Sequence, residues 1–256
     1  MTTNRVTKSI QQDWDDRAKK NAFYYIASWR TDWDLDSFLD SGEDDYKRLV
    51  EPILDRLNVQ TAGKSMVEVG CGAGRMTRSF ARRFGRISAV DISSKMQEQG
   101  KKYLSEFSNI QWLLADGATL TGIDSASNNF VFSYLVLQHL PESSLAHSLL
   151  REVVRVLAPR GAFLLQYNGV LKTPMNWRGR AAWGVVNLFW AAGLKRVGRA
   201  IASGLGLDPE MVGKSWQGVA LRKDEVGAVL RDAGATGLQF SGDGTQMAWC
   251  WGTRAE

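Results

Sequence analysis

The chain has 256 residues, a formal net charge of +5, two cysteines and two histidines. This length can bury one full hydrophobic core, and the cysteine content gives no disulfide framework. The histidines lack neighbouring cysteines at metal-ligand spacing, the N-terminus is polar, and no stretch reaches the roughly 20 apolar residues that span a bilayer. We therefore expect one cytoplasmic domain over residues 1–256 that holds no metal, and the oligomeric state is left open.

Residues 1–60 are predicted to form a helical cap. Charged residues surround Trp14, and the aromatic pair Tyr24 and Tyr25 follows about three turns later if the segment is helical. An aromatic helix face of this kind can fill a core or form the wall of a pocket. A further helix is expected from Tyr46 to Leu57.

The run Met66–Arg75, with the sequence Met-Val-Glu-Val-Gly-Cys-Gly-Ala-Gly-Arg, predicts a buried strand, a glycine turn and the start of a helix. Glycine has no Cβ and adopts positive φ readily, so such a turn can bring its backbone close to a ligand. The spacing is G-x-G-x-G, whereas dinucleotide-binding proteins have G-x-G-x-x-G. A nucleotide-dependent oxidoreductase is therefore disfavoured.

Two following strands are expected to end at acidic residues. The strand Ile87–Val90 leads into Asp91, about 20 residues after the glycines, where a carboxylate usually accepts hydrogen bonds from ribose hydroxyls. The strand Ile110–Ala115 leads into Asp116 in the same way. The alternative is that both acids are N-caps of helices that open just after them.

The remaining elements of the predicted sheet lie in the second half of the chain. Strands are expected at Phe130–Tyr134 and Ala162–Gln166, and a helix at Asp224–Ala233. The chain then ends with the strands Leu238–Phe240 and Gln246–Trp251, which are expected to pair as an antiparallel hairpin at the sheet edge.

The glycine turn, the two acids and the order of the strands resemble those of class I S-adenosylmethionine (SAM)-dependent methyltransferases over about residues 60–168. The resemblance implies an α/β fold with a Rossmann-like class I methyltransferase sheet, mostly parallel with an antiparallel last strand. It divides the chain into the helical cap, a SAM-binding core over 61–169, a helical insertion or lid over 170–215, and final core strands over 216–256. It also implies SAM as cofactor, S-adenosyl-L-homocysteine as product, and no metal.

The resemblance also assigns candidate binding residues. Asp91 would hold the ribose hydroxyls and Asp116 the adenine amino group. The implied cofactor-binding set is Glu68, Gly70, Cys71, Gly72, Gly74, Arg75, Asp91, Ile92, Met96, Asp116, Gly117, Ala118 and Leu135. The substrate candidates are Trp14, Tyr24, Tyr25, Tyr134, Gln138 and Trp177.

His139 is the candidate general base. It follows the fourth strand at the carboxyl edge of the sheet, where ligands bind in open α/β sheets. The alternative is that His139 only packs the loop after that strand. An amine or carbon acceptor would need no protein base.

The charges are unevenly distributed along the chain. Acids dominate between Arg30 and Asp55, whereas Val153 to Leu207 contains no acid and several lysines and arginines. These stretches are either two solvated faces that pack on each other, or the basic one receives an anionic substrate or lipid headgroups. Apolar residues from Trp183 to Ile201 recur at helical spacing, so this helix could cover the site, bind a partner chain or lie on a membrane.

The function expected from these features is SAM-dependent methyl transfer to a small apolar or aromatic metabolite. One alternative is a lipid or quinone-precursor methyltransferase that works at the membrane surface. Another is a SAM-binding partner subunit without catalysis. Nucleic acid is not an expected partner, because no RNA-binding module is recognisable. Peripheral membrane contact remains open.

Overall fold

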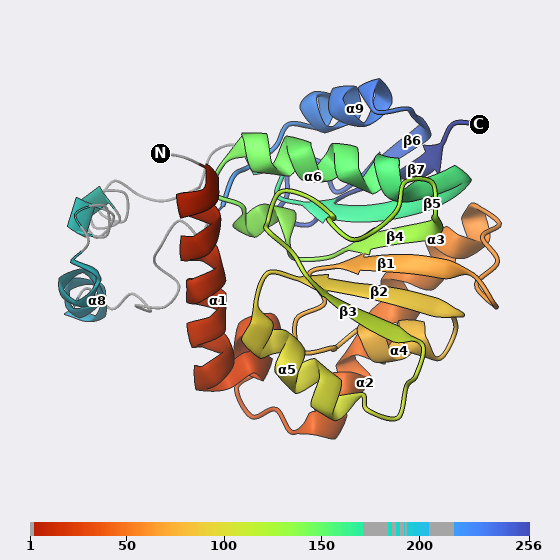
Figure 1. Ribbon diagram of the computed structural model, residues 1–256. Helices are drawn as coiled ribbons and strands as arrows, with labels where there is room; N and C mark the ends of the chain where they lie inside the picture. The colour runs from red at the N-terminus through yellow and green to blue at the C-terminus, as the bar shows by residue number, and fades with distance from the viewer. Residues whose placement is uncertain (1–2, 171–183, 186–187, 190–191, 193, 205–217) are drawn as a thin grey trace.

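The computed structural model describes residues 3–170, 184–185, 188–189, 192, 194–204 and 218–256 (Figure 1). Seven strands form one sheet in the order β3-β2-β1-β4-β5-β7-β6. The strands from β3 to β5 are parallel to their neighbours, and β7 pairs antiparallel with both β5 and β6. The expected sheet, mostly parallel with an antiparallel last strand, is confirmed. The strands are β1 Ser65–Val69, β2 Arg86–Asp91, β3 Ile110–Leu114, β4 Asn128–Ser133, β5 Leu157–Tyr167, β6 Ala235–Ser241 and β7 Ala248–Arg254.

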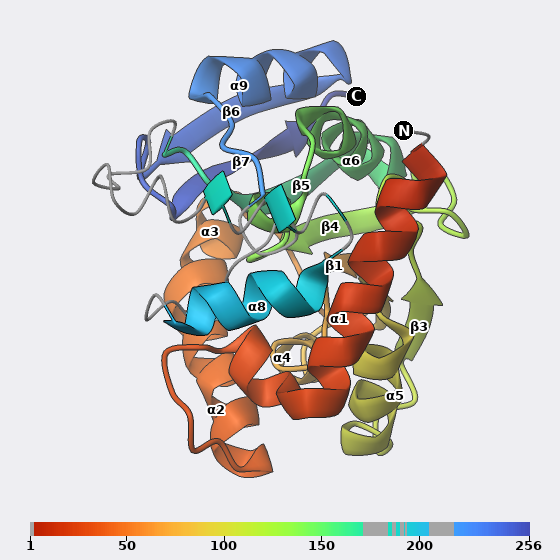
Figure 2. The ribbon, with the colours of Figure 1, turned by 90° about the vertical axis from the view of Figure 1, so that its left-hand side faces the viewer.

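The helices cover both faces of the sheet and its carboxyl edge. The helices α6 and α9 lie on one face, and α3, α4 and α5 lie on the other (Figure 1). Figure 2 shows α1 running past the ends of the strands, and Figure 1 shows α8 set apart from the sheet on the far side of α1. The helical segments are α1 Thr3–Ile26, α2 Leu35–Asp45, η1 Tyr46–Val50, α3 Glu51–Arg56, α4 Thr77–Ala81, α5 Ser94–Tyr103, η2 Leu137–His139, α6 Ser143–Val156, α8 Lys195–Gly204 and α9 Lys223–Asp232.

Side chains at the helix termini explain where two of these helices begin. Asp34 accepts a hydrogen bond from the Ser37 backbone at 2.7 Å, and the Ser37 hydroxyl lies 3.3 Å from the Asp34 backbone nitrogen, which forms a capping box for α2. Ser93 caps α5 by accepting from the Met96 backbone at 3.1 Å. The alternative that Asp91 caps this helix is therefore wrong.

The two core layers follow from the alternation of side chains along the central strands. On β1, Val67 and Val69 pack with α6 and α9, whereas Met66 packs with η1, α3 and α4. Strands that are buried on both faces are almost wholly apolar. Among the four buried residues of β1, Glu68 is the polar exception, and it is only 4% exposed.

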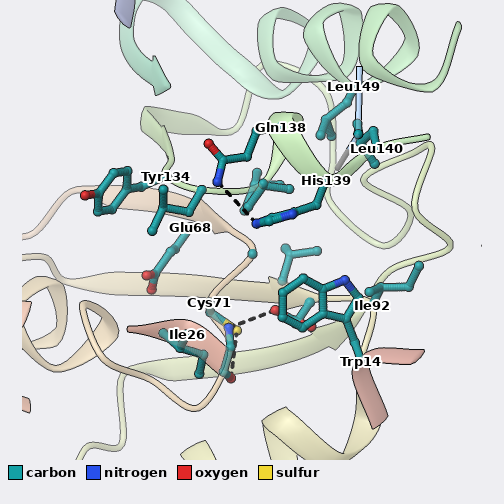
Figure 3. A pocket seen from close by; sticks show the side chains of 18 of the residues that line it. Trp14, Ile26, Glu68, Cys71, Ile92, Tyr134, Gln138, His139, Leu140 and Leu149 are labelled. Atoms are coloured by element: carbon teal, nitrogen blue, oxygen red, sulfur yellow. Dashed lines mark hydrogen bonds between the residues drawn. The ribbon is translucent and has the colours of Figure 1, made fainter. Parts of the chain in front are cut away.

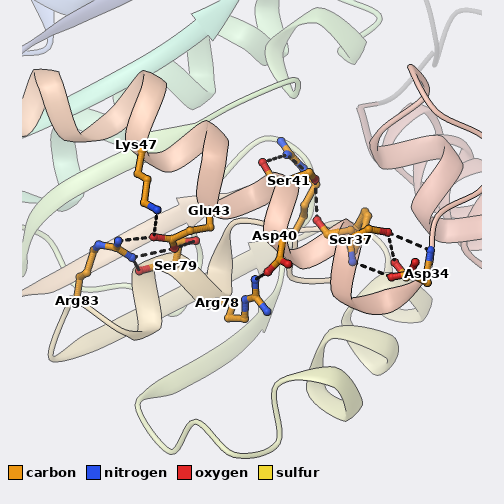
Figure 4. Close-up of polar contacts among 11 residues, drawn as sticks. Asp34, Ser37, Asp40, Ser41, Glu43, Lys47, Arg78, Ser79 and Arg83 are labelled. Atoms are coloured by element: carbon orange, nitrogen blue, oxygen red, sulfur yellow. Dashed lines mark hydrogen bonds and ion pairs between the residues drawn. The ribbon is translucent and has the colours of Figure 1, made fainter.

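Acidic residues of α2 pair with arginines in and just after α4, the helix that follows the glycine turn (Figure 4). Glu43 binds Arg83 with an oxygen–nitrogen distance of 2.5 Å, and Asp40 binds Arg78 at 2.6 Å. Arg83 is the main reason that the pKa of Glu43 falls to about 2. Among the described residues, the ion pairs of this acidic stretch do not involve the basic stretch 153–207. Those of Asp40 and Glu43 join α2 to Arg78 in α4 and to Arg83 just after it.

The part of the insertion that is described consists of α8 and a few residues before it. Val185, Leu188, Leu194 and Val197 are each more than two-fifths exposed. Among the described residues, no helix is long and apolar enough to cross a membrane. Most of the predicted insertion, including Trp177, lies outside the described residues.

Candidate active site

A cavity of about 700 Å³ opens at the carboxyl ends of β1, β2 and β4, beneath α1 (Figure 3). Cavities of this size are typical of sites for small molecules and cofactors. Its walls combine apolar and aromatic side chains with a few buried polar groups. Figure 3 shows Gln138 and His139 on the opposite side of the pocket from Ile26 and Cys71.

The glycine turn forms one end of the cavity. Gly70, Gly72 and Gly74 all have positive φ, at +77°, +55° and +89°, so each is in a conformation that other residues rarely adopt. A Cβ on Gly70 would lie 2.0 Å from Val136 Cγ2, and one on Gly72 would lie 2.8 Å from Ile26 Cδ1. The missing side chains therefore make room first for two apolar side chains of the cavity wall.

Asp91 lies beside this turn and is fixed by the backbone. Its Oδ2 accepts from the Gly72 N–H at 2.8 Å, and its Oδ1 accepts from the Ser93 N–H at 2.8 Å. Burial nevertheless raises the pKa of Asp91 to about 6. Each carboxylate oxygen has two lone pairs, so one on each oxygen remains for a ligand in the cavity.

Glu68 is the second acid in the wall. Its Oε2 accepts a 2.6 Å hydrogen bond from the Thr77 hydroxyl. Burial raises its pKa to about 8, although the Thr77 hydrogen bond and the charge of Arg75 act in the opposite direction. A cationic ligand in the cavity would favour the ionised form of this carboxyl group.

Arg75 is buried between rings and a carboxylate. Its Nη2 lies 2.8 Å from Asp45 Oδ2, and its guanidinium carbon lies 5.3 Å from the centre of the Trp29 ring and 5.8 Å from that of Tyr134. The Arg75 side chain is only 3% exposed. Its charge is thus neutralised within the protein, and the aromatic rings form the accessible part of this wall.

Asp116 lies away from the cavity surface. Its carboxylate accepts from the Ala118 and Thr119 backbone at 2.9 and 2.7 Å, and from the Thr119 hydroxyl at 2.9 Å. Although desolvation raises the pKa of Asp116, these hydrogen bonds together lower it. No helix opens here, so the N-cap alternative for Asp116 is wrong. Its neighbours Ala115 and Gly117 line the cavity instead.

Gln138 and His139 form the other end of the cavity, on the short helix η2. The His139 ring meets the edge of Trp14, with ring centres 5.3 Å apart at 73°. The Nε2 atoms of His139 and Gln138 are 3.3 Å apart. Trp14 belongs to α1, so the helical cap and the loop after β4 enclose this end together.

Gln166 is a polar residue of this region that the sequence did not single out as functional. It lies on β5, is fully buried, and accepts from the Leu135 N–H at 3.0 Å. Leu135 lines the cavity with a φ of +59°, so this bond secures a strained backbone position. A glutamine that follows the apolar run Ala162–Leu165 within one strand is the signal that could have identified it.

Two residues at the bounds of the predicted insertion lie at the cavity. Val170 and Gly218, which flank residues 171–217, both line the cavity. The Gly218 N–H donates to the Gln138 carbonyl at 2.8 Å. A Cβ on Gly218 would lie 2.4 Å from the Leu140 oxygen, so glycine is required at this contact. Gly218 is a second position that sequence analysis missed.

The structure brings most of the expected site residues to this one cavity. Those that line it are Glu68, Gly70, Cys71, Gly72, Arg75, Asp91, Ile92, Met96, Gly117, Leu135, Trp14, Tyr25, Tyr134, Gln138 and His139. Gly74, Asp116, Ala118 and Tyr24 are not among the residues that line it. Tyr24 instead packs its ring against Tyr25, with centres 5.2 Å apart. Among the described residues, no cluster of histidine, cysteine and acidic side chains could hold a metal.

The comparisons with known proteins agree with this arrangement. Residues 67–165 match the family model of the methyltransferase domain. The structure of magnesium protoporphyrin IX methyltransferase from Synechocystis, with bound S-adenosylhomocysteine, superposes with a TM-score of 0.60 at 15% identity, covering 98% of this chain and 100% of that one. The matched segment thus belongs to the methyltransferase domain family, and the predicted class, a class I SAM-dependent methyltransferase, is confirmed.

Two curated relatives match shorter segments. Demethylmenaquinone methyltransferase of Tropheryma whipplei is 37% identical over 57 residues, which are 22% of this chain and 24% of the relative. Ubiquinone biosynthesis O-methyltransferase of Xanthomonas oryzae pv. oryzae is 25% identical over 105 residues, which are 41% of this chain and 43% of the relative. The matched segments therefore span less than half of the length of these relatives.

Proposed function

We propose that this protein transfers the methyl group of SAM to a small, neutral, apolar or aromatic metabolite inside the cavity. The observation that carries the proposal is that one cavity joins the glycine turn and Asp91 to an end walled by aromatic rings and by the amide of Gln138. Cofactor and acceptor would thus meet in one enclosed space.

The residues at the glycine end fit SAM. Asp91 has lone pairs for two ribose hydroxyls, and Glu68 supplies a second carboxyl group for a cofactor that carries positive charge. SAM supplies a sulfonium methyl that is already activated for transfer to a nucleophile. The task left to the protein is to orient the two reactants and exclude water, and orientation alone can contribute about 7–11 kcal/mol.

The charges of the cavity wall favour a neutral acceptor. Among the described residues that line the cavity, Arg75 is the one lysine or arginine, and it is paired with Asp45. A phosphate or carboxylate on the acceptor would find no unpaired cation among them. Trp29, Tyr134 and Met247 offer aromatic and thioether surfaces, which suit an apolar or aromatic ring.

An acceptor screen tests this proposal. The protein is incubated with SAM and with matched sets of phenols, quinols, aromatic amines and phosphorylated amines, and S-adenosylhomocysteine is measured by mass spectrometry. We expect product with neutral aromatic acceptors and none with the phosphorylated amines. The Asp91→Asn variant is the control, and turnover that depends on this site should fall in it. Turnover confined to the phosphorylated amines would contradict the proposed acceptor class.

A second candidate function is methylation of a quinone precursor at the membrane surface. It is favoured by the exposed apolar side chains around α8 and by the names of the two curated relatives, which act in menaquinone and ubiquinone biosynthesis. This function predicts that the protein co-sediments with vesicles of anionic phospholipid at low salt and is released as salt rises. Absence of sedimentation at every lipid composition would remove it and leave the first proposal in place.

A further inference from the structure

The oxygen and the nitrogen of the buried Gln166 amide can be told apart by their hydrogen-bond partners. One end lies 3.0 Å from the Leu135 backbone nitrogen and the other 2.6 Å from the Gln246 carbonyl oxygen. A backbone N–H can only donate and a backbone carbonyl can only accept. The Gln166 oxygen therefore faces Leu135, and its amide nitrogen faces Gln246.

The orientation of the Gln166 amide also fixes that of the Gln138 amide. The Gln166 nitrogen lies 3.1 Å from the Gln138 side-chain amide, and because an amide nitrogen only donates, the atom it meets must be Gln138 Oε1. The nitrogen of Gln138 is then the atom that lies 3.3 Å from His139 Nε2 (Figure 3). An imidazole nitrogen that receives an N–H bond must carry a lone pair and no proton.

We propose that Gln166 and Gln138 are positioning residues that hold His139 as its neutral tautomer with the proton on Nδ1. Nε2 is then occupied by the Gln138 amide and does not receive the proton of a methyl acceptor. Each amide nitrogen carries two hydrogens, so Gln138 keeps one N–H to donate within the cavity that it lines.

The second consequence rests on the proposed function and refines it. Because the amide of Gln138 offers a donor, the site recognises a neutral acceptor molecule that bears a hydrogen-bond-accepting oxygen, such as a carbonyl or a hydroxyl group. His139 then helps to orient this acceptor, and its Nε2 takes up no proton during methyl transfer.

The tautomer can be observed directly, because the chain has only two histidines. The full-length protein is labelled with ¹⁵N-histidine, and long-range ¹H–¹⁵N spectra are recorded at about pH 8, where an unperturbed imidazole is neutral. His147 is the internal reference: its Nε2 lies 2.6 Å from Glu225 Oε1, so that nitrogen carries a proton. We expect opposite patterns, with His139 protonated on Nδ1, and the His147→Asn variant assigns the signals.

The Gln166→Glu variant tests the direction of the hydrogen bonds that link Gln166, Gln138 and His139. At a pH high enough to ionise it, the new carboxylate can still accept from Leu135 but cannot donate, so Gln138 should rotate to donate to it and turn its own oxygen toward His139. The proton of His139 should then move to Nε2. Gln97→Glu is the matched control, because Gln97 is also a buried glutamine whose nitrogen donates to a backbone carbonyl, that of Leu113 at 2.5 Å. It should leave the tautomer of His139 unchanged.

A wild-type spectrum with His139 protonated on Nε2, or on both nitrogens, would overturn the proposal. So would a Gln166→Glu variant that is folded and keeps the wild-type tautomer. If Gln166→Glu does not fold, the wild-type spectrum alone decides. These spectra need no acceptor and no SAM, so failure of the proposed function would leave their outcome intact.

Discussion

The Asp91 carboxylate accepts the Gly72 backbone N–H at 2.8 Å, and this bond ties the end of β2 to the glycine turn that follows β1. Two features that lie far apart in the sequence are thus locked into one ligand-binding surface. Parallel neighbouring strands end at the same edge of the sheet, which is why the pairing of β1 with β2 brings them together. The predictions for cofactor binding follow from this contact.

Asp91→Ala is expected to weaken SAM binding by roughly 2–4 kcal/mol, because it removes charge-assisted hydrogen bonds to the ribose. Asp116→Ala should lose less, roughly 1–2 kcal/mol, since the Asp116 carboxylate is occupied by Ala118 and Thr119. Isothermal titration calorimetry measures both, and circular dichroism checks that each variant is folded. Equal affinity of the wild type and a folded Asp91→Ala variant would show that Asp91 does not hold the cofactor.

Stability in the absence of cofactor is expected to fall between pH 5 and pH 8. The pKa of Glu68 is about 8 in the folded chain against 4.5 as the reference value, so over this range the folded state binds a proton that the unfolded state has released. Asp91, with a pKa of about 6, acts in the same direction at the lower end. The loss should be of the order of a few kcal/mol in the free energy of unfolding.

Urea denaturation at several pH values measures this slope for the wild type and for Glu68→Gln, which cannot titrate. The variant should lose much of the slope above about pH 7, where Asp91 has largely finished titrating. An unchanged slope in a folded variant would show that Glu68 is already ionised in the folded protein.

Gly218→Ala is expected to damage the rim of the cavity. Its Cβ would lie 2.4 Å from the Leu140 oxygen and 2.5 Å from the Gln138 oxygen, so the contact between the returning chain and η2 must open. We expect a loss of about 1–3 kcal/mol in stability and a larger loss of methyl transfer than of SAM affinity. Gly184→Ala is the control, because a Cβ there meets no atom of the described residues within 4 Å. Equal effects of the two substitutions would contradict the role given to Gly218.

His139→Ala should lower kcat by less than tenfold once an acceptor is known, because its Nε2 is engaged by Gln138. A general base typically contributes 10²–10⁴-fold, so the two roles are well separated in rate. The pH–rate profile of this variant should keep the same limbs as that of the wild type. A drop of a hundredfold or more together with the loss of a limb near neutral pH would restore His139 as the base.

The sheet and the glycine end of the cavity could be predicted because they depend on local signals. The glycine spacing, the apolar run of each strand and the acid that ends β2 can each be recognised within a short stretch of neighbouring residues. The orientation of the Asp116 side chain could not be predicted from such signals. Its carboxylate turns toward Thr119, and sequence spacing does not reveal the direction of a side chain.

Gln166 and Gly218 could not be predicted as site residues for a related reason. Gln166 bonds Leu135 and Gln246, which lie 31 and 80 positions away, and Gly218 packs on the backbone around His139. Contacts of this kind exist only once the chain has folded. A polar residue in an apolar strand indicates that such a partner exists but does not identify it.

The most direct test of the account is a calorimetric titration of the full chain with S-adenosylhomocysteine, with NAD as the comparison ligand. We expect one site of micromolar affinity, on the order of −8 kcal/mol, for S-adenosylhomocysteine and no heat of binding for NAD. A folded protein that shows no binding of S-adenosylhomocysteine, or that binds NAD with equal affinity, would contradict it.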